Sequence, residues 1–159
     1  MDTYLAVASK RDWRRYANRS LPDEVVTRIL DAGRLAGSAR NRQPWEFVIV
    51  SDREALANAV YAPDNVRTAA LAVAIVGDAG LDIGRAAQNM MLAAWGDGVV
   101  SCPNGIRDAD AAQAVVGAVP ALVLSFGYPA TPRDPTRRSA DEWSRRANRK
   151  PLDELVRQV

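Results

Sequence analysis

The sequence contains no histidine and only one cysteine, Cys102, among its 159 residues. The absence of histidine excludes Ser-His-Asp catalysis, Cys-His catalysis and any histidine-based metal site. A single cysteine also excludes an internal disulfide framework, a thiolate zinc cluster and an iron–sulfur centre. Any chemistry must therefore be carried by carboxylates, arginines or a bound organic cofactor.

Long hydrophobic runs are missing as well. The longest apolar stretches, residues 69–76 and 119–126, have the length of strands rather than of membrane spans. Residues 1–8 lack the basic start and long apolar stretch of a secretory signal. Because one unpaired cysteine suits a reducing compartment, we expect a cytoplasmic protein without a membrane partner. The length predicts one domain over residues 1–159.

The positive charge is concentrated in two segments. The net charge is only +2, but residues 10–19 and residues 133–150 each carry +4, which leaves about −6 on the rest. All cations except Lys10 and Lys150 are arginines, whose planar fork suits phosphate recognition. Either segment alone is typical of a solvated helix face. Neither is interleaved with aromatic residues in a nucleic-acid motif, so we expect no nucleic-acid partner.

Hydrophobic periodicity predicts an α+β or α/β layered domain. Ser20-Leu21-Pro22-Asp23 resembles a capping box for a helix that ends near Gly37, and Asp82 is expected to cap a long central helix through Trp95. The other expected helices cover residues 4–8, 53–60 and 108–116, with a turn at 62–65 and a short helix or strand at 151–156. The expected strands cover residues 45–50, 69–76, 99–100 and 119–127.

Four ordered groups of motifs resemble one protein family. Residues 38–47, S-A-R-N-R-Q-P-W-E-F, resemble the P-S-x-x-N-x-Q-P-W-x-F signature of the nitroreductase family. Residues 10–16 are similar to its N-terminal R-R-S-x-R-x-F/Y run. Residues 87–94 match its central helix, and residues 100–106 match the G-S-C-x-x-G-like loop that follows it. Residues 126–129 resemble its last strand, and residues 149–155 resemble its closing segment.

This resemblance implies a three-layer α/β/α sandwich with a central, mostly antiparallel sheet. It also implies a homodimer with two FMN sites at the subunit interface, each built from both chains. Lys10, Arg11, Arg149 and Lys150 would then hold the FMN phosphate. Arg14 falls where the family places a cation near N1 and the C2 carbonyl of the flavin, where negative charge accumulates on reduction.

The remaining expected flavin contacts come from two loops. Ser38, Ala39 and Asn41 would reach the flavin from the partner chain. Asn104 and Gly105 would present backbone N–H groups toward N5 and the C4 carbonyl, with glycine allowing close approach. The resemblance assigns no side chain as a catalytic acid or base, because the cofactor performs the hydride chemistry.

The sequence departs from the family pattern at several positions. Asp12 stands where the family usually has a phosphate-contacting serine, Gly37 replaces a proline, and Arg40 replaces a small residue. The segment between Gly127 and the tail is short, which would leave the flavin face more open. Trp13 either lines the cofactor or packs under the first helix, and Cys102 is most simply a small buried thiol.

The expected activity is an FMN-dependent NAD(P)H oxidoreductase with ping-pong hydride transfer to nitroaromatics, quinones or flavins. Two alternatives stay open at this stage. Relatives with the same cofactor reduce activated alkenes, remove halides or fragment flavin, and a non-catalytic flavin-binding or regulatory module would keep the fold without the reaction.

Overall fold

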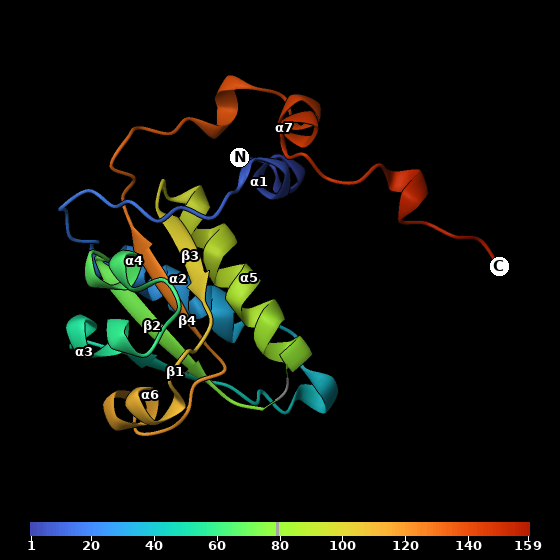
Figure 1. Ribbon diagram of the computed structural model, residues 1–159. Helices are drawn as coiled ribbons and strands as arrows, with labels where there is room; N and C mark the ends of the chain where they lie inside the picture. The colour runs from blue at the N-terminus through green and yellow to red at the C-terminus, as the bar shows by residue number, and fades with distance from the viewer. Residues whose placement is uncertain (79) are drawn as a thin grey trace. The chain divides into compact units, whose positions relative to one another are not determined.

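The computed structural model describes residues 1–78 and 80–159 (Figure 1). The chain divides into two compact units, one of residues 1–10 together with 134–159, the other of residues 11–133. That the whole chain acts as one domain stays a prediction.

The larger unit is built around a four-stranded sheet in which every neighbouring pair is antiparallel. The strands are β1 (Glu46–Ile49), β2 (Leu71–Val76), β3 (Val100–Asn104) and β4 (Leu122–Gly127), in the spatial order β1-β2-β4-β3. Phe47 pairs with Ile75, and Cys102 pairs with Ser125. This confirms the expected mixed α+β fold with an antiparallel sheet.

Helices cover both faces of this sheet. Successive strand residues point to opposite sides, so the apolar strand β2 presents an apolar surface on each face. Leu71, Val73 and Ile75 pack in one core with α2 (Asp23–Arg34) and α5 (Gly80–Gly96). Ala72 and Ala74 pack in a second core with residues of α3, α4 and α6. These three helices span Arg53–Asn58, Pro63–Arg67 and Ala109–Val116. The result is the three-layer arrangement expected from the resemblance (Figure 1).

Close packing between α2 and α5 depends on Gly33. A Cβ atom at this position would lie 2.8 Å from the Met90 side chain and 2.8 Å from the ring of Phe47. The buried face of α5 includes Ile83, Ala87 and Met90, as the helical spacing predicts. Glycine therefore lets the two helices approach each other over β1.

Several expected helix boundaries were wrong. The N-cap of α2 is Pro22 and no side chain caps it, and the helix ends at Arg34, before Gly37. Helix α5 already begins at Gly80, so Asp82 lies inside its first turn and does not cap it. The expected turn at residues 62–65 overlaps α4, in which Pro63 occupies one of the first helical positions.

The smaller unit contains α1 (Thr3–Ser9), α7 (Ala140–Arg146) and two 3-10 turns, η2 (Pro135–Arg137) and η3 (Leu152–Glu154). Helix α1 confirms the expected helix at residues 4–8, and η3 lies within the expected element at 151–156. Helix α7 was not expected. Within residues 1–78 and 80–159, no helix combines the length and apolar character needed to cross a bilayer.

Candidate functional site

The basic segment that follows α1 runs along the beginning of β3. Trp13 N–H donates to the Ser101 carbonyl at 2.9 Å, and Asp12 forms a parallel bridge with Ser101. The Arg133 guanidinium lies 3.5 Å from the centroid of the Trp13 ring. Trp13 is therefore fixed by its backbone bond to β3 and by a cation–π contact on its ring.

Arg14 and Arg15 follow on the exposed side of this segment. Together with Ala62, Pro63, Asp64 and Asn65 they line a hollow of about 250 Å³. Within residues 1–78 and 80–159, no ion pair is found for either arginine. The hollow is smaller than the ~300–1,000 Å³ typical of complete ligand pockets, so this face supplies only part of the wall that a cofactor needs.

A buried network of polar side chains joins this hollow to the sheet. Asn65 Nδ2 donates to Asn104 Oδ1 at 2.9 Å, and Ser125 Oγ donates to Asn65 Oδ1 at 2.6 Å. The Tyr16 hydroxyl donates to the Ser125 carbonyl at 3.1 Å. Burial raises the pKa of Tyr16 well above its usual range, so the phenol stays neutral. This network holds the basic segment, α4 and the end of β3 in fixed register.

The side chain of Asn104 belongs to this network rather than to the surface. Its Nδ2 also donates to the Cys102 carbonyl at 3.1 Å. Any contact of Asn104 with a ligand must therefore come from its backbone, as the sequence analysis expected. Gly105 is exposed, and a Cβ atom there would meet the ring of Tyr61 at 3.4 Å.

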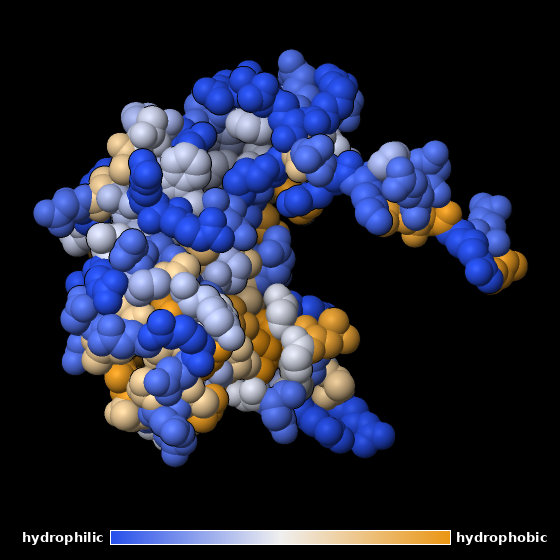
Figure 2. Space-filling model, in the orientation of Figure 1, coloured by the Kyte–Doolittle hydropathy of each residue, from blue (hydrophilic) through white to orange (hydrophobic). Residues whose placement is uncertain are grey.

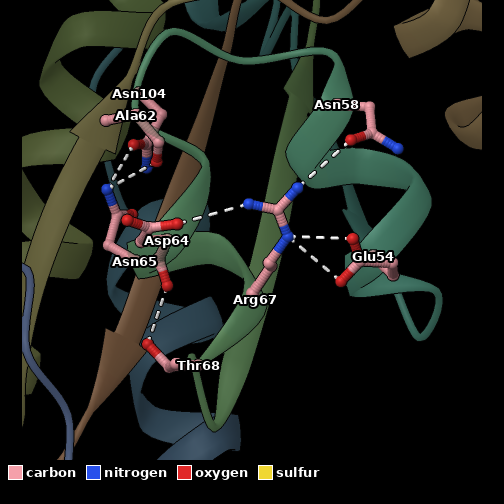
Figure 3. Close-up of polar contacts among 8 residues, drawn as sticks. All are labelled: Glu54, Asn58, Ala62, Asp64, Asn65, Arg67, Thr68 and Asn104. Atoms are coloured by element: carbon pink, nitrogen blue, oxygen red, sulfur yellow. Dashed lines mark hydrogen bonds and ion pairs between the residues drawn. The ribbon is translucent and has the colours of Figure 1, made fainter.

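Arg67 anchors α4 to α3 and was missed by the sequence analysis (Figure 3). Its Nε donates to both carboxylate oxygens of Glu54, at 2.9 and 3.1 Å. One terminal nitrogen pairs with Asp64 at 3.3 Å, and the other donates to Asn58 Oδ1 at 3.2 Å. These bonds raise the pKa of Arg67 further. Arg67 thus stabilises the packing of α4 against α3 beside the hollow.

The loop of the family signature has an unusual backbone. Arg40, Asn41 and Gln43 have positive φ angles of 53°, 55° and 50°, in the left-handed region that costs non-glycine residues ~1–2 kcal/mol. Ser38 Oγ accepts the Gln43 N–H at 2.8 Å. The Ala39 N–H donates to Asp82 Oδ2 at 3.1 Å. The Ala39 N–H is therefore already used within the chain, whereas the Ser38 hydroxyl keeps its own O–H to donate to a ligand.

The predicted flavin residues of the larger unit fall in two separate places. The Ser38–Asn41 loop lies at the N-terminal end of α5, whereas the basic segment of residues 11–15 runs beside the start of β3, at the opposite end of the unit (Figure 1). Within one chain these two sets do not come together. One flavin can contact both only if a second chain supplies one of them.

The other predicted phosphate ligands belong to the smaller unit. Lys10 is the C-cap residue of α1. Arg149 and Lys150 are exposed and lie between α7 and η3. That they converge with Arg11 on one phosphate stays a prediction.

The larger unit is a small α/β/α sandwich with an antiparallel sheet. Its basic segment lines a partly open hollow. By class it is therefore a small mixed α+β protein. Comparisons with known proteins specify the class further. Residues 7–81 match the family model described as "Nitroreductase family". A protein of Archaeoglobus fulgidus, named for NADH dehydrogenase and NAD(P)H nitroreductase activity, is 31% identical, with 80% of this chain and 86% of that protein covered. The chain belongs to the nitroreductase family.

Further relatives agree with this assignment. A protein of Methanothermobacter thermautotrophicus with the same name is 28% identical over 90% of this chain and 88% of its own length. A crystal structure from Bacteroides thetaiotaomicron has a TM-score of 0.76 and 28% identity, covering 87% of this chain and 94% of that one. The fold is shared by a crystal structure from Desulfovibrio desulfuricans in complex with FMN, with a TM-score of 0.81 and 24% identity. That match covers 100% of this chain and 98% of that chain.

Proposed function

We propose that this protein is an FMN-dependent NAD(P)H oxidoreductase that reduces electron-poor acceptors such as nitroaromatics, quinones or flavins. Its membership of the nitroreductase family carries the proposal. Two further findings support it: the D. desulfuricans structure of the same fold was solved with FMN, and the two archaeal relatives are named for NAD(P)H nitroreductase activity.

The residues around the basic segment fit a flavin phosphate and pyrimidine. Arg11 is half-buried and Arg14 is exposed, and guanidinium groups bind phosphate and carbonyl oxygens through paired N–H donors. Lys10, Arg149 and Lys150 would complete the phosphate site. When bound, FMN supplies a hydride carrier that reacts first with NAD(P)H and then with the acceptor, as in ping-pong kinetics.

The protein's own residues then bind and tune the cofactor. Arg14 would place a positive charge where negative charge collects on the reduced ring, which favours reduction. Backbone N–H groups of Asn104 and Gly105 would approach the reacting edge of the ring, since the Asn104 side chain is held inside the sheet. No histidine is needed, because water can supply the protons.

A homodimer would bring the two sets of flavin residues together. The exposed face of α5 includes Gly80, Leu81, Gly84 and Gln88, and Leu81 is 79% exposed. Figure 2 shows hydrophobic surface beside the N-terminal end of this helix. A two-fold axis across the middle of α5 would place the Ser38–Asn41 loop of each chain against the basic segment of the other.

The absorption spectrum of the purified protein tests the proposal. We expect a yellow protein whose flavin band bleaches on adding NADH or NADPH under anaerobic conditions and returns on adding a nitroaromatic or a quinone. A colourless protein that ignores added FMN would contradict it. A flavoprotein that is not reduced by either nicotinamide would favour a non-catalytic flavin-binding module.

Related reactions form the second candidate. The short segment between Gly127 and the tail would leave the flavin face open to larger acceptors. Parallel steady-state assays with a nitroaromatic, a quinone, an enone and a halogenated phenol would rank these acceptors by kcat/KM.

A further inference from the structure

The Ser38–Asn41 loop needs an anchor outside itself. Arg40 and Asn41 both adopt left-handed backbone angles, which persist only where surrounding contacts over-determine them. The local bond from Gln43 N–H to Ser38 Oγ closes the loop but does not attach it to the sheet or helices. The attachment comes from α5.

Asp82 supplies that attachment. It lies in the first turn of α5 and is only 6% exposed. Its Oδ2 accepts the Ala39 N–H at 3.1 Å across a separation of 43 residues. A buried carboxylate is stable only when charge partners and hydrogen bonds compensate its lost hydration, and the Ala39 amide is one of them.

Arg85 is the second partner of Asp82 and also touches the loop. Its Nη1 lies 3.7 Å from Asp82 Oδ1, one helical turn away. The same guanidinium packs directly over Gly37, where a Cβ atom would overlap its other terminal nitrogen. Gly37 has no positive φ angle, so its backbone does not require glycine. The Arg85 guanidinium instead occupies the space that a side chain at position 37 would enter.

We propose that Asp82 and Arg85 are positioning residues that hold the Ser38–Asn41 loop in the conformation that receives the flavin. Asp82 fixes the Ala39 amide, Arg85 orients the carboxylate, and Gly37 leaves the space that Arg85 fills. The flavin part of this inference rests on the proposed function, whereas the anchoring of the loop does not.

Two readouts separate these parts. The first is the hydrogen-exchange rate of the Ala39 amide in the flavin-free protein, followed by NMR in the wild type, Asp82→Ala, Asp82→Asn and Arg85→Gln. The second is the Kd for FMN, from quenching of flavin fluorescence. Asp31→Ala and Arg34→Gln are matched controls, because Asp31 and Arg34 form an i,i+3 ion pair on α2.

We expect Asp82→Ala to speed Ala39 exchange and to raise the Kd for FMN about tenfold, the size of one charge-assisted hydrogen bond. Asp82→Asn and Arg85→Gln keep the packing and should give smaller shifts in the same direction. The two control variants should change neither readout. Unchanged Ala39 exchange in Asp82→Ala would overturn the anchor, and unchanged FMN affinity beside faster exchange would overturn its role toward flavin.

A double-mutant cycle tests the part played by Gly37. Gly37→Ala alone should displace Arg85 and weaken FMN binding as Arg85→Ala does, whereas the double variant should be no weaker than Arg85→Ala. Additive losses of FMN affinity in the double variant would contradict the inference that a side chain at position 37 and Arg85 compete for the same space. If the wild-type protein binds no FMN, both the proposed function and the role of Asp82 and Arg85 toward flavin are refuted. The hydrogen-exchange rate of the Ala39 amide would still test whether Asp82 anchors the loop.

Discussion

At the scale of single residues, Tyr16 joins the basic segment to the centre of the sheet. Its hydroxyl bonds to Ser125, which in turn bonds to Asn65. Tyr16→Phe removes the two buried hydrogen bonds of this hydroxyl, to the Ser125 carbonyl and to Ser125 Oγ, and we expect a loss of about 1–2 kcal/mol in the free energy of unfolding at neutral pH, measured by urea denaturation. Ser125→Ala would remove several bonds of the same network and should cost more.

The raised pKa of Tyr16 also predicts a pH dependence. Because its folded pKa exceeds the unfolded value of 10.0, the unfolded chain releases the phenol proton first as the pH rises. The stability that Tyr16 contributes is therefore complete below pH 10 and falls above it. Urea unfolding between pH 9 and 11 should show this decline in the wild type and a smaller one in Tyr16→Phe. Equal declines would contradict it.

Arg14 is the residue whose proposed role is electrostatic rather than structural. Arg14→Ala should leave the melting temperature almost unchanged, because the side chain is exposed and no ion pair is found for it in the described residues. The midpoint potential of bound flavin should fall by about 30 mV, equivalent to about 1.4 kcal/mol for two electrons. Redox titration measures this, with Arg34→Ala as the control. A normal potential would remove Arg14 from the flavin site.

At the scale of elements, the contact of α2 with α5 sets a strict limit on residue 33. Gly33→Ala gains about 1 kcal/mol in helix propensity. The added Cβ meets Met90 and Phe47 at 2.8 Å, and overpacking of this kind costs ~1–3 kcal/mol. We expect net destabilisation in thermal or urea unfolding. Gly84→Ala, with open space around it, is the control and should be neutral or stabilising in the monomer.

The sequence predicted those elements whose apolar pattern is strong and missed those held by polar contacts. Strand β2 follows from a short continuous apolar run, and helix α5 follows from helical apolar spacing. Helix α7 carries almost no apolar face, yet Ser139 and Glu142 form a capping box that the sequence already contains. Residues 62–65 have turn composition, and the helix there is held by Arg67 through Glu54 and Asp64, partners that no local pattern reveals.

The same distinction applies to the candidate site. Arg14 and Asn41 follow from motifs, because the family signature is local in sequence. Asp82 was expected only as a helix cap, since its true partner, Ala39, lies 43 residues away. Likewise, the sequence could not show that Arg85 fills the space above Gly37. Contacts between distant segments become visible only once the fold brings them together.

At the scale of the whole molecule, the separation of the two proposed flavin sets within one chain would make dimerisation a condition for cofactor binding. Leu81 lies on the exposed face of α5 and is 79% exposed. Leu81→Arg would bury an uncompensated charge in the proposed subunit interface. We expect a monomer that keeps the wild-type circular dichroism spectrum but loses FMN.

Light scattering after gel filtration gives the mass, and the flavin absorbance of the same peak gives the occupancy. Val119→Arg, at a residue 46% exposed between α6 and β4, is the control and should remain a flavin-loaded dimer. If dissociation and FMN loss are linked, adding excess FMN should shift Leu81→Arg back toward the dimer, because a ligand that binds only the dimer stabilises it by mass action. A monomer that retains FMN at wild-type affinity would show that one chain holds the whole site.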